Sequence, residues 1–234
     1  MSKYILNTSL LVAMVTGLSG IIGISTAWLC SSVNFPLRDF LRWMLILPMA
    51  APAYVVAYAY TDILDYSGPI QTQLRLALDL NINPSYFPEI RSMPGAVLIL
   101  SLVLYPYVYL ISLSVFQNQV ARFHDSASVL GASPYKIFTT ITLPTARPAI
   151  AGGLALVAME TVADYGVVQH LGIPTFATGI MRSWMSLSDL TTALQLSAVL
   201  FTVVLVLIVS ESTARRGQVH NPVVSGVLKD EPEL

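Results

Sequence analysis

Five long apolar stretches constrain the fold of this chain more than any other feature of its sequence. A helix of about 20 mostly apolar residues is long enough to cross the hydrocarbon core of a bilayer. The stretches that reach this length are Asn7–Cys30, Trp43–Thr61, Pro94–Gln119, Pro148–Gln169 and Leu190–Ser210. The fourth is unusual because two carboxylates, Glu160 and Asp164, interrupt its second half. This pattern predicts an all-α polytopic membrane bundle of about five transmembrane helices.

The composition agrees with a protein whose solvent is the lipid bilayer. Charged residues make up 11% of the chain and hydrophobic residues 55%, whereas soluble domains carry about 25% charged residues. The formal net charge of −1 lacks the basic excess of a nucleic-acid-binding protein, so no nucleic-acid partner is predicted. A cleaved signal peptide is the alternative for the first stretch, but its apolar region is too long for one.

The sequence contains none of the common motifs of soluble enzymes. The patterns G-x-x-x-x-G-K-[ST], H-E-x-x-H and G-x-S-x-G are all missing, and each would place a phosphate, a metal or a nucleophile. Three widely separated histidines form no spaced metal site, and His170 is predicted to be a surface residue. We therefore predict no enzymatic activity, no metal and no cofactor in this chain. Any ATP that drives it would bind to another subunit.

Small residues and prolines mark two of the predicted spans. Ser19, Gly23 and Ala27 recur every fourth residue, which places them on one helical face and favours close packing inside a bundle. Pro48 and Pro52 lie one turn apart in the second stretch, where they free backbone carbonyls and bend a helix. The bend serves either packing alone or a helix that lines a pathway.

The positive charges are distributed unequally between the two sides of a five-span topology. One side holds eight lysines and arginines: Arg38, Arg42, Arg122, Lys136, Arg147, Arg215, Arg216 and Lys229. The other side holds four: Lys3, Arg75, Arg91 and Arg182. Because cytoplasmic loops carry the excess of positive charge, the first side is predicted to be cytoplasmic. The amino terminus then lies outside and the carboxyl terminus inside.

The stretch from 124 to 150 contains the longest polar connection on that cytoplasmic side. Asp125 and Ser126 suit the start of a helix, because their oxygens accept hydrogen bonds from free N–H groups there. That helix is predicted to end at Gly131, and the Ser-Pro pair at 133–134 to start another. Leu143 precedes a proline and should end the second helix. Two short helices joined at a glycine are therefore predicted.

The spacing of this segment resembles a known family motif. D-S-A-x3-G-x9-I-x-L-P is similar to the E-A-A-x3-G-x9-I-x-L-P loop of binding-protein-dependent (MetI-like) ABC importer permeases, with aspartate for glutamate and serine for the first alanine. The resemblance implies a coupling loop, residues 125–144, that docks on a separate ABC ATPase subunit holding ATP and Mg. Its implied residues are Asp125, Ser126, Ala127, Gly131, Ala132, Ser133, Pro134, Ile141, Leu143 and Pro144. A plain linker is the alternative.

Other segments resemble the ferric-iron branch of these permeases: LPMAAP at 47–52, YSGPIQ at 66–71, METVADYG at 159–166, TFATGI at 175–180 and RSW at 182–184. This likeness implies iron as cargo, delivered by a periplasmic binding protein at the bacterial inner membrane. Branches for thiamine, polyamines or phosphonates are alternatives, and a secondary transporter would need inverted repeats, which we do not find. The iron branch fuses two halves, so residues 1–211 are expected to be one permease domain. Residues 212–234 are then a cytoplasmic tail or a truncated linker to a second half or copy.

The two intramembrane carboxylates are the candidates for a translocation path. Four residues apart on a helix, Glu160 and Asp164 would share one face, and ionisable groups inside a membrane usually face a cavity or a partner. Their hard oxygens suit a ferric ion or its chelate. The residues assigned to a path or gate are Pro48, Pro52, Glu160, Asp164 and Tyr165. The alternative is a hydrated interface with a structural salt bridge, for example to Arg182.

Overall fold

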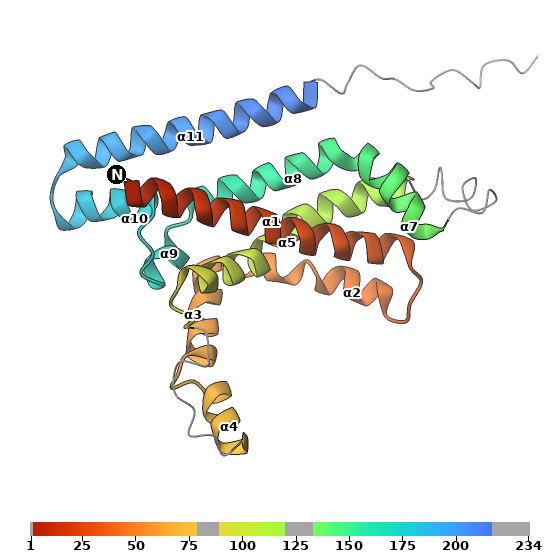
Figure 1. The fold of residues 1–234 in the computed structure, drawn as a ribbon, viewed down its shortest axis with the longest axis horizontal. Coiled ribbons are helices and arrows are strands. Elements are labelled where there is room, and N and C mark those ends of the chain that lie inside the picture. The colour runs from red at the N-terminus through yellow and green to blue at the C-terminus, as the bar shows by residue number, and fades with distance from the viewer. Residues whose placement is uncertain (1, 79–88, 120–132, 217–234) are drawn as a thin grey trace, which may run out of the picture.

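The computed structural model describes residues 2–78, 89–119 and 133–216, and within them every regular element is helical (Figure 1). The predicted all-α class is confirmed. The helices are α1 (Ser2–Ser32), α2 (Arg38–Met44), η1 (Leu47–Ala50), α3 (Ala53–Leu64), α4 (Pro69–Leu78), α5 (Met93–Gln119), α7 (Pro134–Ile137), η4 (Phe138–Thr142), α8 (Leu143–Ala163), α9 (Gly166–His170), α10 (Phe176–Met181), η5 (Arg182–Ser186) and α11 (Leu190–Arg216).

Four helices of this set are long and apolar enough to span a membrane: α1, α5, the continuous run that ends with α8, and α11. They lie side by side in Figure 1, where α1, α5 and α8 contact one another and α11 packs on α8 and α10. One end of this bundle carries α7, and the other carries α9 and α10. These two ends are called the α7 end and the α9 end below. Four of the five predicted spans are thus confirmed.

The second predicted span is not one straight helix. The helical segments 38–50 and 53–77 meet at an angle of 97° across a short break. At the break Ala51 is extended, with φ −103° and ψ 134°, because the ring of Pro52 disfavours helical geometry in the residue before it. As a result α3 and α4 leave the bundle as an arm (Figure 1). The prolines were predicted to bend this stretch, and they break it.

The small-residue face of α1 is buried against α5, as predicted. Ser19 and Ala27 are fully buried. Gly23 lies so close to α5 that a Cβ atom there would stand 2.8 Å from Val108 Cβ and 2.9 Å from the carbonyl oxygen of Tyr105. A backbone that approaches this closely tolerates only glycine.

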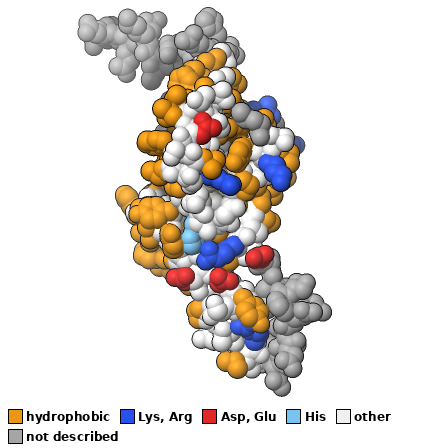
Figure 2. Space-filling view, turned by 90° about the vertical axis from the view of Figure 1, so that its left-hand side faces the viewer, with side chains coloured by type: hydrophobic (Ala, Val, Ile, Leu, Met, Phe, Trp, Pro, Cys, Tyr) orange, Lys and Arg blue, Asp and Glu red, His pale blue; other side chains and the backbone are white. Residues whose placement is uncertain are grey.

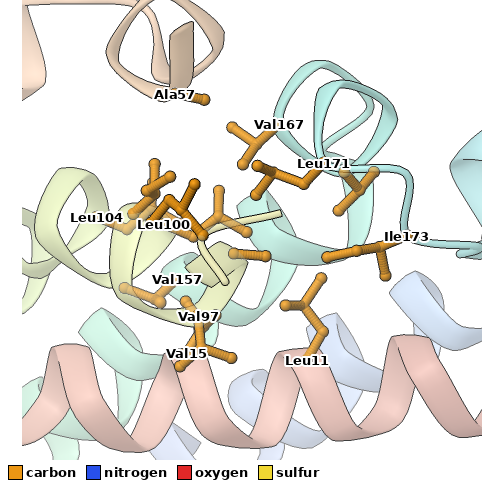
Figure 3. Packing of buried hydrophobic residues seen from close by; sticks show 14 of the residues in the cluster. Leu11, Val15, Ala57, Val97, Leu100, Leu104, Val157, Val167, Leu171 and Ile173 are labelled. Carbon is orange, nitrogen blue, oxygen red and sulfur yellow. The ribbon is translucent and has the colours of Figure 1, made fainter. Parts of the chain in front are cut away.

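The largest hydrophobic cluster joins the bundle to α3 and α9. Figure 3 shows Leu11 and Val15 of α1 facing Val97 and Leu100 of α5, with Val157 of α8 between them. Side chains from outside the long helices complete the cluster: Ala57, Val167, Leu171 and Ile173. The core therefore fixes the short helices of the α9 end against the spans.

The segment after residue 132 departs from the prediction of a helix that stops before Pro144. The helix runs without interruption from α7 through the π-helical turn η4 into α8. In this wider turn the N–H of Leu143 donates to the carbonyl of Phe138, five residues back. Proline excludes the bond to the fourth preceding residue, and Pro144 falls in the first turn of α8, where that bond is not needed. The candidate for the fourth span is therefore the run Tyr135–Ala163, in place of the predicted Pro148–Gln169.

Candidate functional site

At the α7 end, two arginines hold the carboxyl terminus of α1. The last carbonyls of a helix lack partners within it and form the negative end of its dipole. Arg38 Nε donates to the carbonyl of Cys30 at 2.6 Å, and a second nitrogen donates to that of Ser31 at 2.8 Å. Arg42 reaches the same Cys30 carbonyl at 2.7 Å. These contacts fasten α2 to the end of α1.

An aromatic cluster ties the π-helical turn to the spans at the same end. The ring of Phe138 lies 4.9 Å from Trp28 of α1 and 5.9 Å from Phe116 of α5. Movement of η4 would therefore act directly on both helices.

The structure describes only part of the predicted coupling loop. Ser133 precedes α7, and its hydroxyl accepts the Lys136 N–H at 3.4 Å, which agrees with the predicted N-cap. Ile141 lies in the π-helical turn, and Leu143 and Pro144 begin α8. The remaining predicted positions, Asp125, Ser126, Ala127, Gly131 and Ala132, lie outside the described residues.

At the α9 end, the two predicted path carboxylates have different surroundings. Helix α8 ends at Ala163, and Asp164 follows in extended geometry, with φ −64° and ψ 127°. Asp164 thus stands at the carboxyl end of α8, one turn after Glu160, and a shared role of the two carboxylates stays a prediction. Asp164 Oδ2 accepts the N–H groups of Val167 at 3.1 Å and Val168 at 3.2 Å, which caps α9. Glu160 is exposed.

Of the remaining residues predicted to line a path, Tyr165 lies near the helix that follows Pro52. Tyr165, just after Asp164, faces α3, which begins directly after Pro52. The approach is close, because a Cβ atom on Gly166 would stand 2.7 Å from Tyr54 Cβ. Within the described part of the chain Arg182 forms no ion pair, so the alternative salt bridge is not observed there.

Two adjoining cavities of about 410 Å³ each lie on either side of Tyr165 and Gln169, which line both. One cavity is open between α3 and α9, and its lining adds Tyr54, Tyr58, Gly166 and His170. The other lies between the start of α1, the loop after α9 and the α10–η5 segment, and its lining adds Tyr4, Gly172, Ile173, Pro174, Thr178, Met181, Arg182, Met185 and Ser186. Ligand pockets are commonly of this size.

A polar junction that the sequence did not predict joins α3, α9 and the start of α5. Nε2 of His170 lies 2.8 Å from the hydroxyl of Thr61, which is fully buried. The ring of Tyr58 lies 3.9 Å from the imidazole, at an interplanar angle of 43°. Arg91 donates to the His170 carbonyl at 3.3 Å and pairs with Asp65 at 3.6 Å. Figure 2 shows the pale-blue histidine beside basic and acidic side chains near the base of the arm. His170 is thus half-buried and bonded, not a free surface residue.

The junction should make stability depend on pH. Burial, followed by the nearby Arg91, lowers the pKa of His170 below its ordinary value, and Asp62 opposes this only partly. Because the unfolded chain would bind a proton more readily, the contribution of His170 is present above about pH 6.5 and is lost as the pH falls. We expect the melting temperature of the purified protein in nanodiscs to fall from pH 7 to 5.5. His170→Gln, which keeps an N–H donor, should flatten this slope, and an unchanged slope would contradict the assignment.

No group of three or more His, Cys, Asp or Glu side chains that could hold a metal ion occurs in residues 2–78, 89–119 and 133–216.

The helical fold is that of a membrane protein, and comparison with known proteins identifies its family. The family described as "Binding-protein-dependent transport system inner membrane component" matches residues 19–213. The chain belongs to this family.

Relatives within the family carry different cargoes. The sulfate transport system permease protein CysW of Escherichia coli K12 is 30% identical over 148 residues, 63% of this chain and 48% of that protein. The Haemophilus influenzae molybdenum permease protein ModB is 28% identical, over 69% of this chain and 68% of that protein. The Fe(3+)-transport permease protein FbpB 2 of the same organism is 25% identical over 90% of this chain and 37% of its own length. The chain spans about half the length of the sulfate relatives that it matches.

Solved structures share the fold. A bacterial alginate ABC transporter in complex with an alginate pentasaccharide-bound periplasmic protein superposes with a TM-score of 0.76 at 18% identity, covering 94% of this chain and 80% of that one. The inward-facing MetNI methionine ABC transporter gives 0.68 at 12% identity, covering 92% and 94%.

Proposed function

We propose that this chain is the transmembrane permease subunit of an ATP-driven ABC importer. A separate ABC ATPase binds ATP and Mg, a periplasmic binding protein delivers the cargo, and a second permease half or copy completes the pathway. The observation that carries this proposal is the coupling-loop motif in register between α5 and α8. Its described part includes η4, which packs on α1 and α5 through Phe138 and so offers a route from an ATPase to the spans.

The proposed orientation puts the α7 end in the cytoplasm and the α9 end outside the bacterial inner membrane. Arg38, Arg42 and Lys136 belong to the α7 end, whereas Lys3 and Arg182 belong to the α9 end. This separation supports the positive-inside assignment. Residues 1–211 form the permease domain in this proposal, and 212–234 are a cytoplasmic tail or linker.

We propose ferric iron as the cargo. The likeness to the Fe(3+)-transport relative extends over 90% of the chain, against 63% for the E. coli sulfate relative. A sulfate-like or molybdate-like oxyanion is the second candidate, and a specific observation favours it. Asp164 is engaged in capping α9, and among the described residues no carboxylate lines either cavity beside Tyr165.

The path role of the two carboxylates can be tested by uptake in cells that express the full-length protein with its partner subunits. Glu160→Gln with Asp164→Asn should lower uptake of ⁵⁵Fe by about tenfold, the usual cost of removing groups that orient a metal species. Asparagine still accepts a capping hydrogen bond, so α9 should remain folded.

Asp39→Asn is the matched control, because Asp39 is an exposed carboxylate at the opposite end of the bundle, paired with Arg42. Its uptake should equal that of the unmodified protein. Unchanged iron uptake in the double variant would rule out a role of the two carboxylates in the path. Uptake of ³⁵S-sulfate but not of ⁵⁵Fe by the unmodified protein would identify an oxyanion as the cargo.

A further inference from the structure

The cavity between α1, α9 and η5 carries chemistry that the coupling proposal does not use. The residues that line it include Tyr4, Tyr165, Gln169, Arg182 and Ser186, whose side chains carry hydroxyls, an amide and a guanidinium. Arg182 is the one charged residue among the described residues of this lining. A guanidinium presents five N–H donors and no acceptor, and its fork matches carboxylates and tetrahedral oxyanions. The lining is therefore rich in donors and poor in negative charge.

Contacts between distant segments hold the walls of this cavity in place. Asn7 Nδ2 donates to the carbonyl of Pro174 at 3.0 Å, and the hydroxyl of Thr8 accepts the N–H of Phe176 at 3.2 Å. The ring of Tyr4 lies over α10 so closely that a Cβ atom at Gly179 would stand 3.1 Å from it. The start of α1 is thereby fixed to the α10 side, and the cavity is formed within the chain itself.

The turn that ends α9 completes the wall. Gly172 has φ +73°, a left-handed conformation that glycine adopts without strain. The turn lets the N–H of Ile173 bond the carbonyl of Val168 at 2.8 Å. The chain then reverses toward Thr175, whose hydroxyl forms a capping box with Thr178 at the start of α10. The loop on this side of the cavity is thus held by its own backbone.

The two carboxylates nearest to this cavity in the sequence make hydrogen bonds elsewhere. Asp164 precedes Tyr165, but its Oδ2 accepts two backbone N–H groups of α9. Asp189, just after η5, accepts from the backbone and hydroxyl of Thr192. Neither residue belongs to the lining. A bare cation entering here would meet a guanidinium and no available carboxylate.

We propose that this cavity binds an anionic oxygen group of the cargo, either a free tetrahedral oxyanion or a carboxylate of a ferric chelate, through Arg182, Gln169 and the tyrosine hydroxyls. This inference rests on the proposed importer function and refines its cargo. A volume of about 410 Å³ accommodates an oxyanion with its waters or a citrate-sized complex. Iron in this pathway would then travel as an anionic complex.

Equilibrium binding to the purified full-length protein with its partner subunits in nanodiscs tests this proposal. The probes are ³⁵S-sulfate, molybdate, citrate and ⁵⁵Fe-citrate. Arg182→Gln should weaken binding of the recognised anion by at least about tenfold, in line with the strength of a charge-assisted hydrogen bond. Arg182→Lys should recover part of that loss, because it restores the charge without the fork.

Arg75→Gln is the matched control, since Arg75 stacks on Tyr66 and bonds its carbonyl on the α4 arm, away from the cavity. It should bind the anion normally. Binding of sulfate or molybdate alone assigns a free oxyanion, and binding of ferric citrate assigns a chelate. Equal anion binding by the unmodified protein and Arg182→Gln, or no binding of any probe, overturns the proposal. Association with the ATPase in the same preparation separates this failure from failure of the importer function.

Discussion

Replacing Gly23 with leucine is expected to destabilise the bundle by about 3 kcal/mol, at the upper end of the usual cost of overpacking. A new Cβ atom would stand 2.9 Å from two backbone atoms of α5, the Tyr105 oxygen and the Tyr109 nitrogen. Backbone within a helix cannot move aside as a flexible side chain does. The measurement is the unfolding midpoint of the purified protein in mild detergent.

Gly17→Leu is the control on the same helix. A Cβ atom at Gly17 meets nothing within 4 Å, so this variant adds the same bulk without a clash. We expect it to unfold near the midpoint of the unmodified protein. Equal destabilisation by both substitutions would show that leucine in α1 is harmful for a reason other than the contact with α5.

Gly131→Pro and Ala127→Trp are expected to abolish coupling while leaving the protein in the membrane. Proline fixes φ and removes an N–H donor at the predicted bend between two short helices, and tryptophan enlarges a predicted docking surface. Loss of a central interface contact costs 2 kcal/mol or more, about 30-fold in affinity. ATP-driven uptake by cells should fall by about that factor at unchanged permease abundance.

Ala77→Trp is the matched control, because Ala77 is exposed on the α4 arm. It introduces the same bulk far from the coupling loop and should leave uptake unchanged. Full uptake in both loop variants would rule out docking of the ATPase on this segment.

Helix lengths at the spans were largely predictable, whereas the path of the chain between them was not. The uncharged runs predict both ends of α5 closely and the start of α11, whereas α11 continues past the predicted Ser210 to Arg216. Pro52 predicted an irregularity, but the local sequence does not predict the 97° angle between the helical segments before and after it. Leu143 was predicted to end a helix because a following proline disfavours helical geometry, yet Leu143 is helical, with φ −66° and ψ −46°, and the chain passes through the π-helical turn η4 into α8.

The candidate site was predictable only where its contacts are local. Asp164 lies three residues before Val167, a spacing typical of a capping residue, so its role as the cap of α9 was open to prediction. The bond between His170 and Thr61 joins residues 109 positions apart. Tyr4 and Arg182 lie near opposite ends of the chain, and only tertiary packing brings both to one cavity. No local sequence pattern predicts contacts between residues so far apart in the chain.

The measurement that most directly tests the central claim is the ATPase activity of the complex that co-purifies with the full-length protein from its native host. The importer function predicts that an ABC ATPase co-purifies and that a cargo-loaded periplasmic binding protein accelerates its hydrolysis of ATP. Gly131→Pro should remove the ATPase from the preparation. Cargo uptake by a preparation free of any ATPase, driven by an ion gradient alone, would contradict the account.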